Sequence, residues 1–581
     1  MPGIQVYPTQ LLTMDRRDFF RTSINTSDAA TATTLPAATP PPTNRKVRLQ
    51  SGVQLYGGAW GKNELIHLLK RTMFGARKAD VDFFSGQSMS AVVDALLTVP
   101  GNSSTVPVKV YTPNAQTTPA NDPDLALAQG QPWVAVHTND GSVNSGRRAA
   151  FKAWWVGQMV NQERNIQEKM VLFWHNHFAT ETVDISYGIG CYQHNVLLRK
   201  YALGNFKEMV KAITLDPAML RYLNGEKNLK NAPDENYARE LQELFTLGKG
   251  PDSKYTEEDV KQAARVLTGF RIKYADVTSY FDANQHDTGN KTFSSFYNNK
   301  IITGKTGTNG AQELDELLDM IFAQPEVAKH IVRKLYRWFV YYDIDAQVEA
   351  DVITPLANLF RQGNYEIKTV MAALLKSEHF FDPLNQGCQI KSPADLVIGA
   401  VREFNVQFPV ATDFANNYTM WNWLQTNTTN QQQNIGDPPD VSGWKAYYQE
   451  PQFYEIWINS DTLPKRIQFT DTMIINGYTR NGQTIRFDAI AFAKTLPNPG
   501  DPNTLIDDSL LYLYRIPLTV ASKAQIKKDI LLSGQSSDHY WTDAWNAYMA
   551  NPNDNMAMTT VRNRLRSLYQ YFMNLAEYQL A

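Results

Sequence analysis

Two histidines, His175 and His177, stand two positions apart in the stretch FWHNHFAT, residues 173–180. Histidine binds divalent metals and transfers protons near neutral pH, so this spacing is the first candidate for chemistry. The preceding apolar residues recur every four positions, which predicts a buried helix. Positions two apart on a helix lie about 200° around its axis, so the two side chains share a metal only if the helix breaks near His177. The Thr-rich sequence ATETVD that follows predicts such a break.

Three interpretations of these histidines remain open at this stage. They are core residues hydrogen bonded to carbonyls or carboxylates, ligands of a divalent metal such as zinc, or a general acid and base. The apolar run before them predicts that at least one imidazole reaches a polar pocket, because a buried polar group without a partner costs about 1–3 kcal/mol.

The segment PDENYARELQELFTLG provides carboxylates for such a pocket. Asn236, Glu240 and Glu243 recur at i, i+4 and i+7 of a helix that Pro233 is expected to open, beside an apolar face. Glu240 and Glu243 are therefore expected at the edge of the core, where a carboxylate has a shifted pKa or binds a metal. The other interpretation is a solvated helix face.

Two further candidates come from other parts of the chain. His286 and Asp287 are adjacent in the loop sequence NQHDTGNKTF, and loops held by a rigid scaffold carry many catalytic residues. His194, near the start of a predicted helix, is expected to be structural. The resulting hypothesis has His175, His177 and Glu243 as metal ligands and Glu240, His286 and Asp287 as catalytic residues. Zinc would require ligands at about 2.0–2.2 Å in a tetrahedral arrangement.

Composition excludes several classes of protein. The 56 basic residues nearly balance 58 acidic ones, which argues against a nucleic-acid-binding protein. No run of eighteen apolar residues predicts a transmembrane helix. Only Cys191 and Cys388 occur, so neither a Cys-based zinc site nor a disulfide-rich scaffold is expected. The two thiols are expected to be separate and buried; a bridge between them is the alternative if the protein is exported.

Several segments begin with a helix-capping residue and continue with apolar residues at helical spacing, and some end in a glycine. This pattern predicts a mainly α-helical protein with one large multi-helix body. The long polar stretches 100–146, 271–312 and 411–440 are predicted loops. The expected division is a mobile tail over 1–58, a main helical domain over 59–470, and a helical extension over 471–581 that packs on it. The expected helix caps are Asn63, Asp216, Thr256 and Ser392.

The N-terminal segment MDRRDFFRTS is similar to a twin-arginine export signal, with Arg16 and Arg17 followed by Phe19 and Phe20. The apolar stretch that usually follows is missing, and a segment rich in Thr, Ala and Pro takes its place. The prediction is an exported protein, in the periplasm, at the cell surface or outside the cell. An ordinary charged N-terminal arm is the alternative.

Eight motifs in order together resemble the Domain of Unknown Function 1800 family of bacterial proteins, over roughly residues 60–470. The motifs are HLLKRTMFG, FWHNHF, NYARELQELFTLG, YTEEDVKQAARVLTGF, HDTGNKTF, RKLYRWFV, KSPADLVIGAVREF and PPDVSGWKAYY. The resemblance implies export through a twin-arginine signal and a partner among secreted sulfatase- or phosphatase-like proteins. It implies no settled activity.

Two classes of function remain open. The first is an exported enzyme, with or without a metal, that acts on an extracellular polymer such as a polysaccharide. The second is a non-catalytic binding or assembly protein of the cell envelope, which aromatic residues in predicted loops would serve. Those aromatic residues are Trp421, Trp423, Trp444, Tyr447 and Tyr448.

Overall fold

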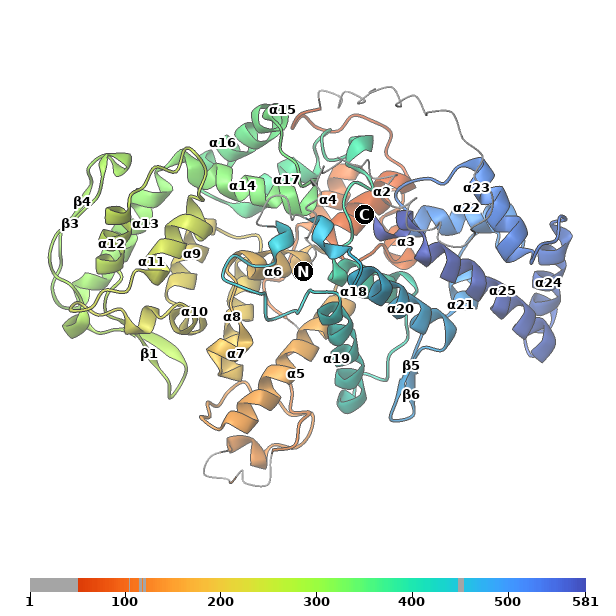
Figure 1. Cartoon of the computed structure of the whole chain (residues 1–581), viewed down its shortest axis with the longest axis horizontal. Coiled ribbons are helices and arrows are strands. Elements are labelled where there is room, and N and C mark those ends of the chain that lie inside the picture. The colour runs from red at the N-terminus through yellow and green to blue at the C-terminus, as the bar shows by residue number, and fades with distance from the viewer. Residues whose placement is uncertain (1–50, 104, 114–117, 119–121, 448–453) are drawn as a thin grey trace, which may run out of the picture. The chain divides into compact units, whose positions relative to one another are not determined.

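The computed structural model describes residues 51–103, 105–113, 118, 122–447 and 454–581 (Figure 1). Helices account for 57% of the chain and strands for 5%. The predicted mainly α-helical fold is therefore confirmed. Residues 50–581 form one compact unit. None of the helices in the described residues is both long enough and apolar enough to cross a membrane.

The first half of the chain contains the helices that carry the FWHNHF motif and the carboxylate segment. They are α2 (Lys62–Thr72), α3 (Lys78–Phe84), α4 (Met89–Leu96), α5 (Gly141–Val160), α6 (Gln167–His177), α7 (Thr182–Ile185), α8 (Gly188–Lys200), α9 (Phe206–Thr214), α10 (Pro217–Tyr222), α11 (Asn236–Glu240), the π-helix η3 (Leu241–Thr246) and α12 (Glu257–Val266).

The second half of the chain continues with helices of similar length. They are α13 (Glu313–Phe322), α14 (Pro325–Phe339), α15 (Ala346–Val348), α16 (Thr354–Gln362), α17 (Ile367–Leu375), α18 (Pro393–Glu403), α19 (Phe414–Asn430), α20 (Thr462–Ile475), α21 (Ala489–Lys494), α22 (Pro502–Leu513), α23 (Val520–Ile526), α24 (His539–Ala550) and α25 (Asn555–Asn574).

Side-chain caps fix many of the helix starts. Asp216, Thr256 and Ser392 each accept a hydrogen bond from the backbone amide three residues on, which confirms three of the predicted caps. The predicted cap at Asn63 is wrong. Helix α2 begins one residue earlier, and the Glu64 carboxylate accepts a hydrogen bond at 3.0 Å from the amide of Gly61.

Strands are confined to three antiparallel pairs in the described residues. They are β1 (Phe270–Lys273) with β2 (Thr278–Phe281), β3 (Lys291–Thr292) with β4 (Ile301–Ile302), and β5 (Tyr478–Arg480) with β6 (Gln483–Ile485). Two of these pairs lie within the predicted loop 271–312. Residues of that loop therefore hold a defined geometry against α12 and α13.

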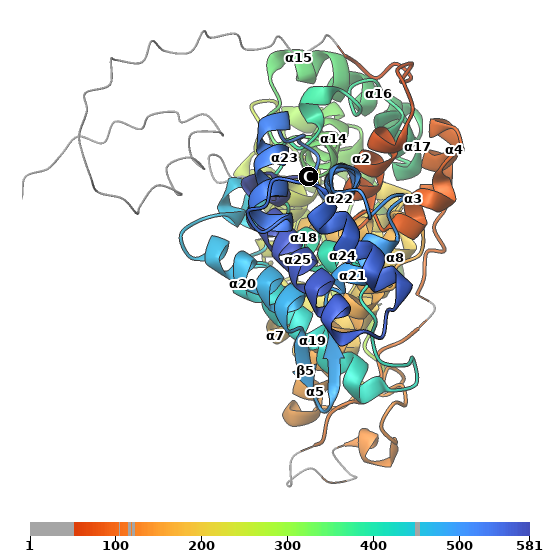
Figure 2. The same ribbon diagram turned by 90° about the vertical axis from the view of Figure 1, so that its right-hand side faces the viewer.

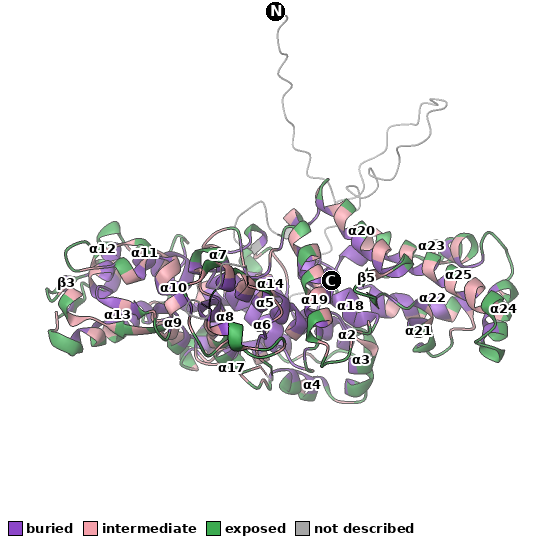
Figure 3. Ribbon diagram, turned by 90° about the horizontal axis from the view of Figure 1, so that it is seen from below, coloured by how far each residue is buried: buried purple, intermediate pink, exposed green. Residues whose placement is uncertain are grey.

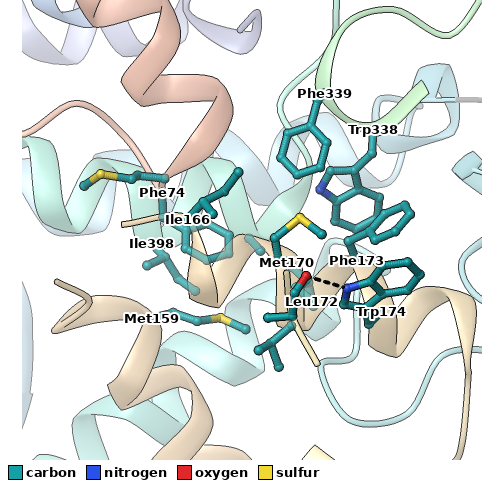
Figure 4. Close-up of a cluster of buried hydrophobic side chains, with 14 of the residues drawn as sticks. Phe74, Met159, Ile166, Met170, Leu172, Phe173, Trp174, Trp338, Phe339 and Ile398 are labelled. Atoms are coloured by element: carbon teal, nitrogen blue, oxygen red, sulfur yellow. Dashed lines mark hydrogen bonds between the residues drawn. The ribbon is translucent and has the colours of Figure 1, made fainter. Parts of the chain in front are cut away.

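Helix α6 lies in the interior, and all eleven of its residues are buried. Figure 4 shows its apolar side chains among those of neighbouring helices, with Phe173 at 5.5 Å and 6.3 Å, ring to ring, from Trp338 and Phe339 of α14. Trp174 donates a hydrogen bond from its indole nitrogen to the carbonyl of Ala202 at 3.0 Å. Burial of each large apolar side chain contributes about 1.5–3 kcal/mol, so α6 anchors the fold.

The C-terminal helices pack together around α25, which contacts α20, α21 and α24 (Figure 2). Helix α20 also contacts α18 and α19. Buried residues line the inner helix faces and exposed residues the outer faces (Figure 3). The predicted boundary near residue 470 falls inside α20, and the helices on its two sides are in contact.

The predicted tail over 1–58 is described only from residue 51. Residues 51–56 are hydrogen bonded to the segment that follows α17, with the Tyr56 amide donating to the carbonyl of Lys376 at 2.9 Å. Leu55 also forms a β-bridge with Ser377. This part of the predicted tail is thus fixed to the helical body, whereas the twin-arginine-like residues lie outside the described residues.

Candidate functional site

The end of α6 directs three consecutive polar side chains to three different parts of the fold. Helix α6 continues through His177, and Phe178 is its C-terminal cap. The helix ends only after His177, so His175, Asn176 and His177 all remain helical. The metal hypothesis required the helix to break before both histidines were part of it. Successive helical residues are turned by about 100°, so these side chains diverge.

His175 points into a small internal cavity of about 10 Å³. Its ring lies 5.0 Å from that of Trp155 and 6.2 Å from that of His194. Its Nε2 atom is buried and has no hydrogen-bond partner among the residues that the structure describes. Burial, and then the nearby His194, lowers the pKa of His175 to about 3. His194 is held through Nδ1 at 2.8 Å from the Asp216 carboxylate, which also caps α10. This contact supports the structural role expected for His194.

Asn176 fastens the loop formed by residues 436–444, which has the sequence GDPPDVSGW. The Asn176 side-chain oxygen accepts a hydrogen bond from the Trp444 amide at 2.7 Å. Gly443 lies directly against Asn176 with φ +88°, and a Cβ atom at this position would overlap the Asn176 backbone oxygen. The asparagine between the two histidines thus fixes a loop more than 250 residues away in sequence.

His177 binds the end of the helix that carries the candidate carboxylates. Its Nε2 atom lies 3.1 Å from the carbonyl oxygen of Phe245, which can only accept, so Nε2 carries the proton. Its Nδ1 atom lies 3.0 Å from the Lys334 ammonium nitrogen. His330 and Lys334 both bond to the preceding carbonyl, that of Leu244, at 3.1 Å and 3.3 Å. These three side chains satisfy carbonyls that the end of a helix leaves unpaired.

The pKa values of this group follow from its burial. Burial, and then the Lys334 charge, holds the pKa of His177 well below its usual value. Burial, and then Arg337, lowers the pKa of Lys334 to about 7. His177 is therefore expected to be neutral, and both of its ring nitrogens already have protein partners.

The carboxylate helix begins at Asn236, three residues after the predicted start at Pro233, and becomes a π-helix, η3, after Glu240. A π-turn widens the helix locally and occurs frequently at functional sites. Glu240 and Glu243 lie three residues apart on this helix, and the charge of Glu243 acts on Glu240. Glu240 is half-buried and Glu243 is 9% exposed, as predicted for residues at the edge of the core.

The half-buried Glu240 carboxyl group lies in surroundings that hold its pKa well above the usual value. Its Oε2 atom is buried and has no hydrogen-bond partner in the described residues. Burial, and then the neighbouring Glu243, raises the pKa of Glu240 to about 7. Glu243 forms an ion pair with Lys249. A carboxyl group with a pKa near neutrality beside a second carboxyl group is an arrangement that acid–base catalysis uses.

Further carboxylates approach from the 436–444 loop and from α7. The charge of Asp440 acts on both Glu240 and Glu181, so it lies near both. Burial, and then Asp184, raises the pKa of Glu181, whose carboxylate accepts a hydrogen bond from the Tyr222 hydroxyl at 3.4 Å. We define the carboxylate site by these side chains together with the Tyr255 ring. Its members are Glu181, Asp184, Tyr222, Glu240, Glu243, Tyr255 and Asp440.

Sequence reasoning missed three of these carboxylates. Glu181 and Asp184 belong to the ATETVD segment, which was interpreted only as the end of a helix, and Asp440 ends the GDPPD segment of a predicted loop. The signal that could have identified them was the presence of acidic residues in the family motif PPDVSGW and immediately after FWHNHF. Neither motif reveals on its own that the segments meet near Glu240.

His286 and Asp287 belong to a separate hydrogen-bonded network that holds the 271–312 loop. The His286 ring nitrogens lie 2.9 Å from the Thr268 carbonyl oxygen and 3.1 Å from the Glu313 carboxylate. Asp287 pairs with Arg265 at 2.7 Å. Both partners of His286 are buried, so its bonds are already satisfied. In the described residues, no hydrogen bond joins Glu240, the third predicted catalytic residue, to His286 or Asp287.

The predicted metal ligands are also not brought together. His175 faces the cavity beside His194, His177 binds a carbonyl and a lysine, and Glu243 pairs with Lys249. Within the described residues no group of three or more His, Cys, Asp or Glu side chains is placed to hold a metal ion. The physical reason is the unbroken helix through His177. Cys191 and Cys388 are both buried and free, so the disulfide alternative is not formed.

The aromatic residues proposed for a binding surface are largely packed. Trp444 is 2% exposed. The ring of Trp423 stacks on that of Tyr478 at 4.4 Å, and Trp421 covers Gly157. The side chain of Tyr447 and all of Tyr448 lie outside the described residues. The three tryptophans thus support the fold and provide no exposed aromatic platform.

Replacement of Gly443 by alanine should destabilise the 436–444 loop, because the added Cβ meets the Asn176 backbone oxygen. We expect a loss of about 1–3 kcal/mol in the free energy of unfolding, measured by urea denaturation. Gly482→Ala is a matched control, since Gly482 also has a positive φ, +75°, but a Cβ there meets nothing within 4 Å. Equal losses in the two variants would mean that the strain of a positive φ explains the whole effect. They would contradict a clash between the added Cβ and Asn176.

Comparison with known families finds one family model that covers most of the chain. The structure defines a mainly α-helical protein with a carboxylate site held by the end of a buried helix. A model of the family described as Protein of unknown function (DUF1800) matches residues 67–580. The chain belongs to this family. Neither the curated proteins nor the solved structures contain a match.

Proposed function

We propose that this protein is an exported enzyme that cleaves an extracellular polymer such as a polysaccharide by acid–base catalysis. The observation that carries the proposal is the Glu240 carboxyl group, which has one buried and unpaired oxygen beside a second, ion-paired carboxylate. A carboxyl group in such surroundings keeps its proton near neutral pH and can donate it.

In the proposed mechanism Glu240 donates a proton to the oxygen of the bond that breaks. Asp440 is the general base that activates water, since its Oδ1 atom accepts bonds from Ser442 while its Oδ2 atom has no bond in the described residues. Glu243 takes no part in bond cleavage. Its negative charge, fixed by Lys249, keeps Glu240 protonated. Paired acidic side chains of this kind hydrolyse glycosidic bonds in many enzymes.

The buried histidine of the FWHNHF motif is a positioning residue in this proposal. His177 holds the carbonyl of Phe245 at the end of η3, and Asn176 holds the loop that carries Asp440. The acid and the base are thus positioned by neighbouring residues of one helix. This arrangement supports a site whose parts keep a constant separation.

Export and partnership complete the proposal. The twin-arginine-like pair Arg16 and Arg17 is expected to direct the chain out of the cytoplasm, and a secreted sulfatase- or phosphatase-like protein is the expected partner. Replacement of both arginines by lysine should leave the protein in the cytoplasm, as measured by cell fractionation. Unchanged export of that variant would contradict the signal.

The catalytic part is tested with the purified full chain and a panel of neutral and acidic polysaccharides. The measurement is the release of new reducing ends by the native protein, Glu240→Gln and the control Glu235→Gln. Glu235 caps the same helix but pairs with Arg239 outside the pair of carboxyl groups. Release that Glu240→Gln lacks and the control retains supports the proposal. No release from any polysaccharide, or undiminished release by Glu240→Gln, contradicts it.

A further inference from the structure

Three arginines and a lysine line a cavity among the C-terminal helices, separate from the carboxylate site. The cavity has a volume of about 260 Å³. Arg486 follows strand β6, Lys494 ends α21, and Arg562 and Arg566 lie four residues apart on α25. Helices α21 and α25 are in contact (Figure 2). Asp488 is the one acidic residue that lines the cavity.

The cations of this cavity lack anionic partners within the described residues. The side chains of Arg486 and Arg566 form no ion pair and donate no hydrogen bond there. Arg562 donates only to the Thr559 hydroxyl, at 3.3 Å, and its buried Nε atom has no partner. Lys494 donates to a neutral group, the Tyr548 hydroxyl, at 2.9 Å.

The single carboxylate does not neutralise this charge. Asp488 caps α21, and its Oδ1 atom accepts a hydrogen bond from the Ala491 amide at 2.9 Å. Like charges four apart on a helix, as at Arg562 and Arg566, are themselves unfavourable. Burial, and then the charges of Arg562 and Arg486, lowers the pKa of Arg566. A bound anion would remove this repulsion.

The chemistry of the lining residues indicates which anion fits. Guanidinium groups present paired N–H donors that match the oxygens of phosphate and sulfate groups. A larger cavity of about 610 Å³ shares Arg486 and Asp488 with the first one. It adds amide and hydroxyl groups that suit a polar molecule attached to the anion, from Asn405, Gln407, Thr484 and Thr495. Two basic residues, Arg77 and Lys78, and two carboxylates, Asp82 and Glu403, also line this cavity.

We propose that the Arg486–Lys494–Arg562–Arg566 cavity binds the phosphate or sulfate group of a small polar molecule such as a sugar ester. The guanidinium groups bind the anion, and the adjoining cavity holds the rest of the molecule. This site lies on different elements from the carboxylate site and does not depend on the proposed catalytic function.

Isothermal titration of the full chain at low ionic strength tests the proposal with three probes. The probes are glucose 6-phosphate, glucose 6-sulfate and inorganic phosphate. The variant Arg562→Gln/Arg566→Gln should weaken binding of the esters about tenfold or more, because two of the guanidinium groups that bind the anion are removed. The control is Arg564→Gln on the same helix. The Arg564 guanidinium donates a hydrogen bond to the Tyr540 carbonyl at 2.5 Å and lines neither cavity.

Circular dichroism of both variants confirms that each is folded before binding is compared. Retention of affinity in Arg564→Gln with loss in the double variant supports the site. Tighter binding of the esters than of inorganic phosphate would show that the larger cavity is part of the binding site. Equal binding of all three probes would show that the site recognises the anion group alone. No binding of any probe, or equal loss in the control, overturns the proposal.

Discussion

Acidification from pH 7.5 to 5.5 should lower the free energy of unfolding by about 2–4 kcal/mol. Three histidines, His67, His175 and His177, are at most 4% exposed, and burial is the largest cause that lowers the pKa of each. In the unfolded chain the histidine pKa is about 6.5. Below that value the unfolded state therefore binds more protons than the folded state, and protons favour unfolding.

The size of the effect follows from the number of groups. Each histidine contributes about 1.4 kcal/mol over this interval, so three contribute about 4 kcal/mol. Glu240 acts in the opposite direction, because its pKa is raised to about 7 and the folded state gains a proton there. Since Glu240 is only half-buried, it offsets less than about 2 kcal/mol. The loss on acidification is a large share of a typical stability of about 5–15 kcal/mol.

Urea denaturation at pH 7.5, 6.5 and 5.5 measures this dependence. The variant His175→Leu should lose about one third of it, because one of the three buried imidazoles is gone. His539→Gln, which changes an exposed histidine, should retain the full dependence. A free energy of unfolding that is constant between pH 7.5 and 5.5 would show that the buried histidines are not held neutral.

The helical fold could be predicted from local patterns because most of its signals lie within single helices. Ser392 with Pro393 and Thr256 with Asp259 begin helices through contacts only three residues long. The π-turn after Glu240 could not be predicted in this way. Its widened backbone is held by His177, His330 and Lys334, which come from α6 and α14.

The candidate site could be predicted only in part, for a related reason. Glu240 and Glu243 were identified because helical spacing places them beside an apolar stripe, which is local information. Asp440 and Glu181 reach the same site through tertiary packing, which no spacing in the sequence reports. His286 was a reasonable catalytic candidate by residue type, but Glu313, twenty-seven residues later, occupies its ring nitrogen.

The FWHNHF motif explains why residue type alone misled the metal hypothesis. A pair of histidines and a nearby glutamate suggest a metal, yet the unbroken helix turns each side chain toward its own partner. His175 fills the space beside Trp155, Asn176 fastens the 436–444 loop, and His177 binds the end of η3. One helical turn thus links three segments, two of which carry members of the carboxylate site.

Replacement of Glu240 by glutamine should lower the rate of polymer cleavage by about 10²–10⁴, the usual contribution of a general acid. Glutamine keeps the shape of the side chain but has no proton to donate. In the native protein the rate should fall as the pH rises above about 7, because Glu240 then loses its proton. The direction follows from the role of an acid, which acts only while protonated.

The neighbouring carboxylate provides a sharper test of the same assignment. The charge of Glu243 is the second cause, after burial, of the raised pKa of Glu240. The variant Glu243→Gln should therefore lower the pKa of Glu240 and move the alkaline limb of the rate profile to lower pH, while some activity remains. Glu235→Gln should leave the limb in place. If the limb also stays in place in Glu243→Gln, a group other than Glu240 donates the proton.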